Sequence, residues 1–160
     1  MGSCYPKTGS SSENSFMNAT FDLTEVYKGQ LSLANRGIAI VNQQYIVVCD
    51  ELKTSETEAN VRYTLLTSAH VKLLGDGTAE LTKNGKKLIL KVQEPGHVVM
   101  RTWSTASAKD YDAPIPGTTL VGFETTVPEM TETSLYVFLI PEKVTNKVIF
   151  NDMQLKKWNK

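Results

Sequence analysis

The amino-acid sequence predicts an all-β protein, a two-layer antiparallel β-sandwich of about ten to twelve strands. Short runs of β-branched and aromatic residues recur along the chain, separated by turn-forming residues at the roughly 8–12-residue spacing of all-β domains. Two of these runs, residues 45–49 and 135–140, are apolar at nearly every position, as in strands covered on both faces. These solid runs favour two stacked sheets; a closed barrel, whose strands alternate more cleanly, stays the alternative.

Composition limits the number of domains and the kinds of partner. With 160 residues, of which 41% are hydrophobic and 21% are charged, the chain suits one globular domain. The 17 basic and 17 acidic side chains cancel, so no overall field attracts nucleic acid or an anionic membrane. No apolar run approaches the roughly 20 residues that span a bilayer. The sequence therefore predicts neither a nucleic-acid partner nor a membrane partner.

The chain divides into a short leader and one domain. Residues 1–15 are rich in Ser, and we expect them to be a flexible leader or to be foreign to the natural protein. Residues 16–160 are expected to form a single β-sandwich domain, which begins with a half-buried strand over residues 16–23. Residues 24–29 predict one helical turn, capped by Asp22 or by the first residue of the turn, and it is the only helix expected.

A hairpin over residues 36–52 is expected in the middle of the sandwich. Its arms, residues 38–41 and 45–49, consist of β-branched, aromatic and other apolar residues, and three amide residues form the bend between them. Both arms are apolar at nearly every position, which predicts core strands covered on both faces. Cys49 falls in the second arm and is expected to be a buried free thiol rather than the disulfide partner of Cys4.

The rest of the chain also reads as strands and turns. Further strands are expected over residues 61–66, 71–74, 79–81, 88–92, 97–104, 120–123, 135–140, 148–150 and 153–158. The Asn84-Gly85 pair predicts a type I′ hairpin, because both residues adopt positive φ at low cost. Residues 105–117 contain two prolines and several small residues, and they predict a long exposed loop.

The order of several short motifs carries a family resemblance. An arginine, Arg36, opens a strand, a polar bend follows, and the second strand closes on Asp50-Glu51-Leu52. The upstream motif is Phe-Asp-Leu-Thr-Glu-Val-Tyr at residues 21–27, and the downstream motifs cover residues 63–67, 81–88 and 137–141. In this order and spacing the motifs resemble the C-terminal β-sandwich of heparinase II/III-like polysaccharide lyases, and the resemblance covers nearly the whole chain.

This resemblance implies a role within a larger enzyme. Heparinase II/III-like lyases abstract the proton α to a uronic carboxylate and then β-eliminate, using Tyr and His residues from a helical toroid and from the start of the β domain. Those segments would lie before residue 1, so no catalytic residue is carried over to this chain. The resemblance implies a non-catalytic portion that supports the helical catalytic domain and shapes the substrate cleft. It also implies an acidic polysaccharide, such as a glycosaminoglycan, as ligand and a bacterial, periplasmic or secreted parent protein.

The residues themselves offer no catalytic or metal constellation. His70 and His97 lie on separate predicted elements, and neither stands beside a nucleophile elbow or a cluster of metal-ligand side chains. Asp50 and Glu51 are adjacent in a strand and point to opposite faces, so they cannot act as the acid and base of one glycosidase site. An ion pair of Asp50 with Arg36, or a strand-end turn, is expected instead. The sequence therefore assigns no catalytic residue, no cofactor and no metal.

The candidate glycan contacts are Trp103, Asp110, Tyr111 and Asp112. An aromatic ring and carboxylates in one long loop region can supply a stacking surface and acceptors for sugar hydroxyls. On this interpretation the chain is an autonomous carbohydrate-binding module, which is the alternative to a portion of a lyase. A small standalone enzyme is a third hypothesis. The opposing structural interpretation is that Trp103 packs in the core while the loop docks against the missing domain.

A second candidate for contact with an acidic glycan is the basic β-hairpin around the Asn84-Gly85 turn. It carries four lysines, namely Lys83, Lys86, Lys87 and Lys91. Lysines at a sheet edge also serve to keep the edge solvated and unpaired, which is the ordinary structural explanation.

Overall fold

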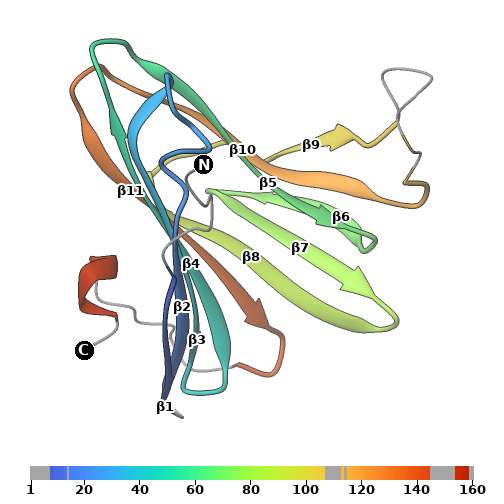
Figure 1. The fold of residues 1–160 in the computed structure, drawn as a ribbon. Coiled ribbons are helices and arrows are strands. Elements are labelled where there is room, and N and C mark those ends of the chain that lie inside the picture. The colour runs from blue at the N-terminus through green and yellow to red at the C-terminus, as the bar shows by residue number, and fades with distance from the viewer. Residues whose placement is uncertain (1–7, 14, 107–112, 114, 145–153, 159–160) are drawn as a thin grey trace.

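The protein is built from strands, as predicted. A computed structural model of the chain describes residues 8–13, 15–106, 113, 115–144 and 154–158. In this part of the chain, eleven strands form two antiparallel sheets (Figure 1), which confirms the predicted fold class. The large sheet has the spatial order β1 (Thr8–Glu13), β2 (Phe16–Asp22), β3 (Leu31–Val41), β4 (Tyr45–Thr54), β11 (Glu132–Pro141), β8 (Lys86–Glu94), β7 (Thr78–Lys83) and β6 (His70–Gly75). The small sheet has the order β5 (Ala59–Thr67), β10 (Thr119–Val127) and β9 (Arg101–Ser104).

The predicted hairpin is present as β3 and β4, in the interior of the large sheet. β4 lies between β3 and β11, and its successive residues Val47, Val48 and Cys49 are all buried. Cys49 is a free buried thiol, as expected. β3 differs from the prediction, because Ile38 and Ile40 on one of its faces keep 40% and 38% of their surface exposed. Of the two arms of the hairpin, β4 alone is therefore covered on both faces.

The first strand lies inside the predicted leader. Residues 8–13 were expected to be flexible, and this is wrong, because they form β1 at the edge of the large sheet. β1 pairs antiparallel with β2, with Thr8 opposite Phe21 and Glu13 opposite Phe16. Strand pairing satisfies backbone N–H and C=O groups whatever the side chains are, so a Ser-rich segment can add to an edge. That residues 16–160 form a single domain stays a prediction.

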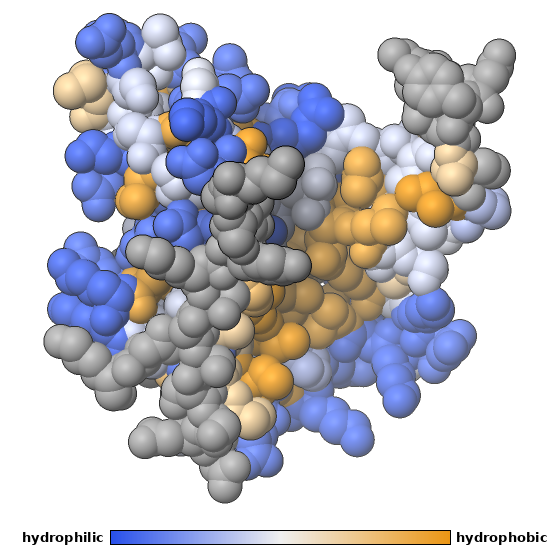
Figure 2. All heavy atoms as spheres, viewed as in Figure 1, coloured by the Kyte–Doolittle hydropathy of each residue, from blue (hydrophilic) through white to orange (hydrophobic). Residues whose placement is uncertain are grey.

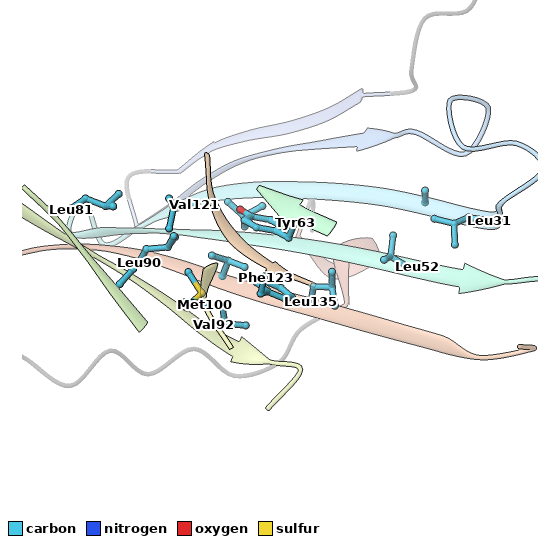
Figure 3. Packing of buried hydrophobic residues seen from close by; sticks show 14 residues of the cluster. Leu31, Leu52, Tyr63, Leu81, Leu90, Val92, Met100, Val121, Phe123 and Leu135 are labelled. Atoms are coloured by element: carbon cyan, nitrogen blue, oxygen red, sulfur yellow. The ribbon is translucent and has the colours of Figure 1, made fainter. Parts of the chain in front are cut away.

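One face of the large sheet packs against the small sheet. Figure 3 shows the side chains of this main core in the space between the sheets, from Leu81 at one end to Leu31 at the other. In its centre the rings of Tyr63 and Phe123 stack with their centroids 5.5 Å apart. These two residues are cross-strand partners on β5 and β10, so the register of the small sheet fixes the stack.

The opposite face of the large sheet is covered by the end of the chain. Residues 153–158 were predicted to be a strand, and this is wrong, because Leu155–Lys157 form a short 3₁₀ helix, η1. Leu155 and the following Trp158 are buried in a second core cluster with residues of β3, β4 and β11. Residues three apart lie above one another on a 3₁₀ helix, so Leu155 and Trp158 face the sheet together. The predicted strand over residues 148–150 lies outside the described residues.

Specific contacts hold this C-terminal segment on the sheet. Gly37 of β3 lies beneath it, and a Cβ atom there would approach Trp158 Cζ3 to 2.8 Å. Glu51 Oε1 accepts a hydrogen bond from Leu155 N at 2.7 Å, and Asn18 Nδ2 donates to Trp158 O at 3.1 Å. The missing side chain at Gly37 therefore makes room for the indole ring, while polar groups of β2 and β4 fix the segment.

The predicted turns are largely present. Residues 24–30 form a hydrogen-bonded turn, which Asp22 Oδ1 caps by accepting from Thr24 N at 3.0 Å. Asn84 and Gly85 have φ values of 49° and 72°, as a type I′ hairpin requires. The strand expected over residues 97–104 is shorter, because regular pairing of β9 begins only at Arg101.

Among the residues that the structure describes, no helix has the length and apolar character needed to cross a membrane.

Candidate functional site

The outward surface of the small sheet carries the first candidate site. Alternate residues of a strand point to the same face, so the register places Arg62 of β5 opposite Glu124 of β10. Four residues along, Leu120 of β10 lies between Leu66 of β5 and Trp103 of β9. We call this surface the Arg62–Trp103 face. Three strands thus bring an arginine, a glutamate, a tryptophan and two leucines onto one side of a three-stranded sheet.

Arg62 links the charged and aromatic parts of this face. Its Nε and Nη2 atoms each lie 2.7 Å from Glu124 Oε1, and its Cζ lies 5.0 Å from the centroid of the Trp103 ring. The side chains of Arg62 and Glu124 are 55% and 46% exposed. Exposed ion pairs contribute only about 0–1 kcal/mol to stability. The arrangement therefore orients polar groups and a ring toward solvent more than it stabilises the sheet.

The middle of the Arg62–Trp103 face has no side chain. Gly122 lies between Thr64 of β5 and Arg101 of β9, and it is buried because the backbone of β5 at Tyr63 and Thr64 lies close against it. At the far end of the same strands a shallow hollow is lined by residues that include Asn60, Arg62 and Glu124. A sheet face with one stacking ring and exposed polar side chains can hold an extended polar chain that lies across its strands.

The predicted glycan contacts have different outcomes. Trp103 is half-buried on β9 and belongs to neither buried core cluster, so the interpretation that it packs in the core is wrong. Asp110, Tyr111 and Asp112 lie outside the described residues. The ends of their loop are tied together, because Thr105 Oγ1 donates to Thr118 O at 2.9 Å.

A second candidate site is a cavity between the two sheets, beside the turn of residues 24–30. It measures about 140 Å³, and its aliphatic lining residues are Leu23, Leu31, Ala34, Leu52, Ala59, Val61 and Leu135. The polar part of its wall contains Arg36 and Asp50 of the large sheet and Tyr63 of the small sheet, and the lining is completed by Tyr27, Gln30, Asn35, Asn60 and Arg62. We call it the Arg36 cavity. It brings the predicted Arg36–Asp50 pair next to a residue that the sequence did not single out, Tyr63.

The Arg36–Asp50 pair is bidentate, as the cross-strand register of β3 and β4 allows. Arg36 Nε donates to Asp50 Oδ1 at 2.6 Å, and Arg36 Nη2 donates to Asp50 Oδ2 at 2.7 Å. Asp50 is nearly buried, whereas 40% of the Arg36 side chain is exposed. The expected ion pair is confirmed. Glu51 points to the opposite face, where it binds the C-terminal segment, so the two carboxylates do not share a site.

Electrostatics fix the protonation states in the Arg36 cavity. The hydrogen bonds to Asp50 raise the pKa of Arg36 above its ordinary value, although desolvation acts in the opposite direction. Desolvation by burial raises the pKa of Tyr63 to about 12, while the charge of Arg36 lowers it in part. The Arg36 Cζ lies 5.5 Å from the centroid of the Tyr63 ring. At neutral pH the cavity therefore presents a cation paired with an anion, and a protonated phenol.

The histidines and lysines of the chain form no comparable site. His70 and His97 are exposed, on β6 and in the turn before β9. No group of three or more His, Cys, Asp or Glu side chains able to hold a metal occurs in the described part of the chain. In the basic hairpin, Lys87 Nζ pairs with Glu80 Oε2 at 3.3 Å and Lys83 Nζ bonds Ser68 Oγ. Two of its four lysines are thus engaged within the protein.

Comparison with known proteins gives a likeness of fold. The chain matches no protein-family model, and no curated protein matches it. Among solved structures, heparan sulfate lyase HepC from Pedobacter heparinus is similar, with a TM-score of 0.66 at 13% identity over 84% of this chain. A structure of heparinase III has a TM-score of 0.62 at 14% identity, also over 84% of the chain. The heparinase III BT4657 gene product has a TM-score of 0.60 at 18% identity over 86% of the chain.

The chain spans only a small part of these neighbours. The alignments cover 21% of HepC, 21% of heparinase III and 22% of the BT4657 product. At such low identity the match concerns the fold, and the resemblance to the β-sandwich of heparinase II/III-like lyases is confirmed at that level. The described chain therefore shares its two-sheet fold with about a fifth of each of these heparinase chains.

Proposed function

We propose that the chain is the non-catalytic β-sandwich portion of a polysaccharide lyase that β-eliminates uronic-acid-containing glycans. The observation that carries this proposal is the likeness to HepC over 84% of the chain but only 21% of HepC. Because the aligned region is only about a fifth of HepC, most residues of such a lyase lie outside this region. In this proposal the groups that abstract the proton are among those other residues. In this proposal the present chain supports a helical catalytic domain and forms one wall of the substrate cleft.

The surface of the molecule supports a partner domain. Figure 2 shows apolar surface gathered around the middle of the viewed face, over the region where Figure 1 places β5 to β8. Leu66 of β5 and Leu73 and Leu74 of β6 are 45–50% exposed. Contiguous apolar surface on a domain is commonly an interface with another domain. Docking of the catalytic domain would remove this surface from water.

The proposal is tested by comparing the chain with the product of the complete reading frame that encodes it. Each is incubated with heparan sulfate, chondroitin, hyaluronan and alginate, and the absorbance of the unsaturated uronic product is followed. We expect cleavage of at least one polymer by the complete product and none by the chain alone. Turnover by the chain itself, abolished by substitution of His70 or His97, would contradict the non-catalytic assignment.

A second function, that of an autonomous carbohydrate-binding module, is favoured by one observation, the Arg62–Trp103 face. Arg62 is held between Glu124 and the Trp103 ring, and the face is open to solvent. Stacking of a sugar ring on Trp103, with hydroxyl groups on Arg62 and Glu124, is the contact that we propose. Asp110, Tyr111 and Asp112 follow Trp103 in the chain, and we propose them as further contacts of the same ligand.

Amide chemical shifts of the labelled chain distinguish this binding function from a supporting role. On titration with acidic oligosaccharides, a binding module shows saturable shifts at Arg62, Trp103 and residues 110–112. Trp103→Ala should weaken binding about tenfold, since stacking of one ring contributes about 0.5–1.5 kcal/mol beyond the area it buries. Lys86→Asp, on the exposed basic hairpin, is the matched control and should bind as the parent does. Shifts confined to residues 83–91 would refute this binding face.

A further inference from the structure

The Arg36 cavity has room for one functional group of a larger ligand. Its volume is about 140 Å³, whereas pockets that enclose a whole drug-sized ligand measure about 300–1,000 Å³. A dry cavity of about 150 Å³ holds a molecule the size of benzene. A group of a few heavy atoms can therefore enter the Arg36 cavity while the rest of the ligand stays outside.

The polar wall of the cavity offers hydrogen-bond donors. Asp50 occupies the Nε and Nη2 atoms of Arg36, and Nη1 has no partner among the described residues. The Tyr63 hydroxyl also makes no hydrogen bond to a described residue. Among the described residues, the only buried side-chain N or O atom without a partner is Asn18 Oδ1, so the Tyr63 hydroxyl is not fully buried. The hydroxyl of Tyr63 therefore keeps some accessible surface, and Tyr63 lines the cavity, although the residue as a whole is only 7% exposed.

Both donors are held in place before any ligand arrives. The guanidinium of Arg36 is fixed in its plane by two bonds to Asp50 and lies over the Tyr63 ring. The Tyr63 ring in turn stacks on Phe123 at an interplanar angle of 12°. Preorganised donors lose little conformational entropy on binding, so they favour the binding of an acceptor atom.

The charges of the cavity favour a neutral acceptor over an anionic one. The charges of Arg36 and Asp50 cancel, and Asp50 is nearly buried. Arg62, which also lines the cavity, is paired with Glu124. A ligand carboxylate on the free end of the guanidinium would be repelled by the Asp50 carboxylate across a poorly solvated space. An amide carbonyl carries acceptor lone pairs without a net charge and avoids this repulsion.

The aliphatic part of the lining favours an apolar group next to that carbonyl. Leu31, Ala59 and Val61 are among seven aliphatic residues that line the cavity. A methyl group placed against them gains about 0.8 kcal/mol on burial, whereas a hydroxyl or ammonium group would lose its hydration there. The site thus combines two fixed donors with a methyl-sized apolar recess.

We propose that the Arg36 cavity binds the acetamido group of an N-acetylated hexosamine residue. The acetamido carbonyl accepts from Arg36 Nη1 and Tyr63 Oη, its methyl group packs on the aliphatic wall, and the sugar ring remains at the mouth of the cavity. The choice of a sugar as the bearer of the amide rests on the proposed function. The cavity and the Arg62–Trp103 face share lining residues on β5, Asn60–Arg62, so one glycan chain crossing β5 can reach both sites.

The test is a titration of the isotope-labelled chain with small probes, followed by amide and tyrosine-ring resonances. The methyl glycoside of N-acetylglucosamine should shift residues 34–36 and 61–63 in a saturable manner. The methyl glycosides of glucosamine and glucuronic acid should bind at least about tenfold more weakly, since they lack the amide carbonyl and its methyl group. Equal binding of the glucuronide, or no saturable shift with the N-acetyl sugar, overturns the proposal. N-acetylalanine methylamide tests a peptide source, and tighter binding of this probe than of the sugar also overturns it.

Two substitutions locate the binding in the cavity. Tyr63→Phe keeps the ring stack and removes only the hydroxyl, and it should weaken N-acetylglucosaminide binding about fivefold. Ala59→Leu fills the apolar recess and should abolish binding. Tyr45→Phe is the matched control, because Tyr45 is buried on the opposite face of the large sheet, and it should leave affinity unchanged. Full affinity in both cavity variants, with their folded spectra retained, overturns the assignment.

This experiment is independent of the test for lyase activity. If the complete gene product cleaves a polymer but the chain binds no N-acetyl sugar, the cavity assignment fails and the proposed function stands. If the chain binds the N-acetyl sugar in the cavity but the complete product cleaves nothing, the lyase assignment fails and the binding site stands.

Discussion

Arg36 and Asp50 face each other on neighbouring strands and make two hydrogen bonds of 2.6 and 2.7 Å. Their pairing follows from the register of β3 and β4, which also places Glu51 on the other side of the sheet. The pair lies at the rim of the main core, where the Asp50 side chain is 8% exposed. A carboxylate at that depth depends on its partner, because little water reaches it.

Removal of Arg36 should therefore destabilise the fold. We expect Arg36→Ala to lower the free energy of unfolding by about 2–4 kcal/mol, because it leaves Asp50 buried without a counter-charge. The double variant Arg36→Met/Asp50→Leu removes both charges and should be closer to the parent than Arg36→Ala is. Urea denaturation measures all three proteins. A loss below about 1 kcal/mol in Arg36→Ala would show that water already compensates Asp50.

Alkaline pH should weaken the fold through Tyr63. Its pKa is raised from 10.0 to about 12, so between these values the folded state keeps a proton that the unfolded chain loses. The contribution of Tyr63 to the free energy of unfolding is therefore fully present below pH 10. It falls by about 2–3 kcal/mol as the pH rises toward 12. Burial also raises the pKa of Tyr45, which adds to the fall.

Tyr63→Phe isolates this contribution, since phenylalanine does not titrate. We expect urea denaturation of the variant to show a smaller loss of stability above pH 10 than the parent. Identical pH profiles of the two proteins would mean that Tyr63 titrates normally in the folded state.

The hairpin of β3 and β4 should be indispensable to the fold. Val47 is fully buried in β4, so Val47→Asp places an unpaired carboxylate in the second core cluster. This costs several kcal/mol against a total stability of about 5–15 kcal/mol, and we expect the variant to be unfolded. Lys86→Asp changes an exposed position and serves as the control. The two variants are compared with the parent by circular dichroism and thermal melting. An unchanged melting temperature for Val47→Asp would contradict the burial of β4.

A side chain at position 37 should displace the C-terminal segment. Gly37→Val would place atoms within 3.0 Å of the Trp158 ring and closer still to Leu155, so the segment must shift or detach. In a Trp103→Phe background, where Trp158 is the remaining tryptophan, we expect its fluorescence to move to longer wavelength. Gly96→Ala is the matched control, since an added Cβ there meets nothing within 4 Å. An unchanged emission maximum for Gly37→Val would show that the sheet yields instead of the segment.

Local patterns were sufficient to predict the central hairpin, its bend and the Arg36–Asp50 pair. Each depends on residues close in sequence, whose alternation and turn chemistry decide the register. The opposite orientation of Asp50 and Glu51 follows from the two-residue period of a strand, and the structure confirms it. Such features need no knowledge of what packs against the hairpin.

The elements that were predicted wrongly depend on distant partners. β1 is strand because β2 offers an open edge, which the composition of residues 8–13 does not reveal. η1 is a 3₁₀ helix because Gly37, more than a hundred residues earlier, leaves room for Trp158. The contact between Arg62 and Trp103 joins strands separated by β6, β7 and β8 in sequence, and only the register of the small sheet brings them together. These contacts join residues that are far apart in the chain, so they cannot be predicted from local sequence patterns before the fold is known.

The C-terminal segment on β3 has a consequence for biosynthesis. Asn18 Nδ2 bonds the carbonyl oxygen of Trp158, a partner 140 residues later in the chain. During translation, β2, β3 and β4 are made early, but one face of their sheet stays uncovered until residues 155–158 emerge from the ribosome. Long-range closure of this kind slows folding and exposes apolar strands to association with other chains. A nascent chain stalled before Leu155 should therefore depend on chaperones that bind apolar segments.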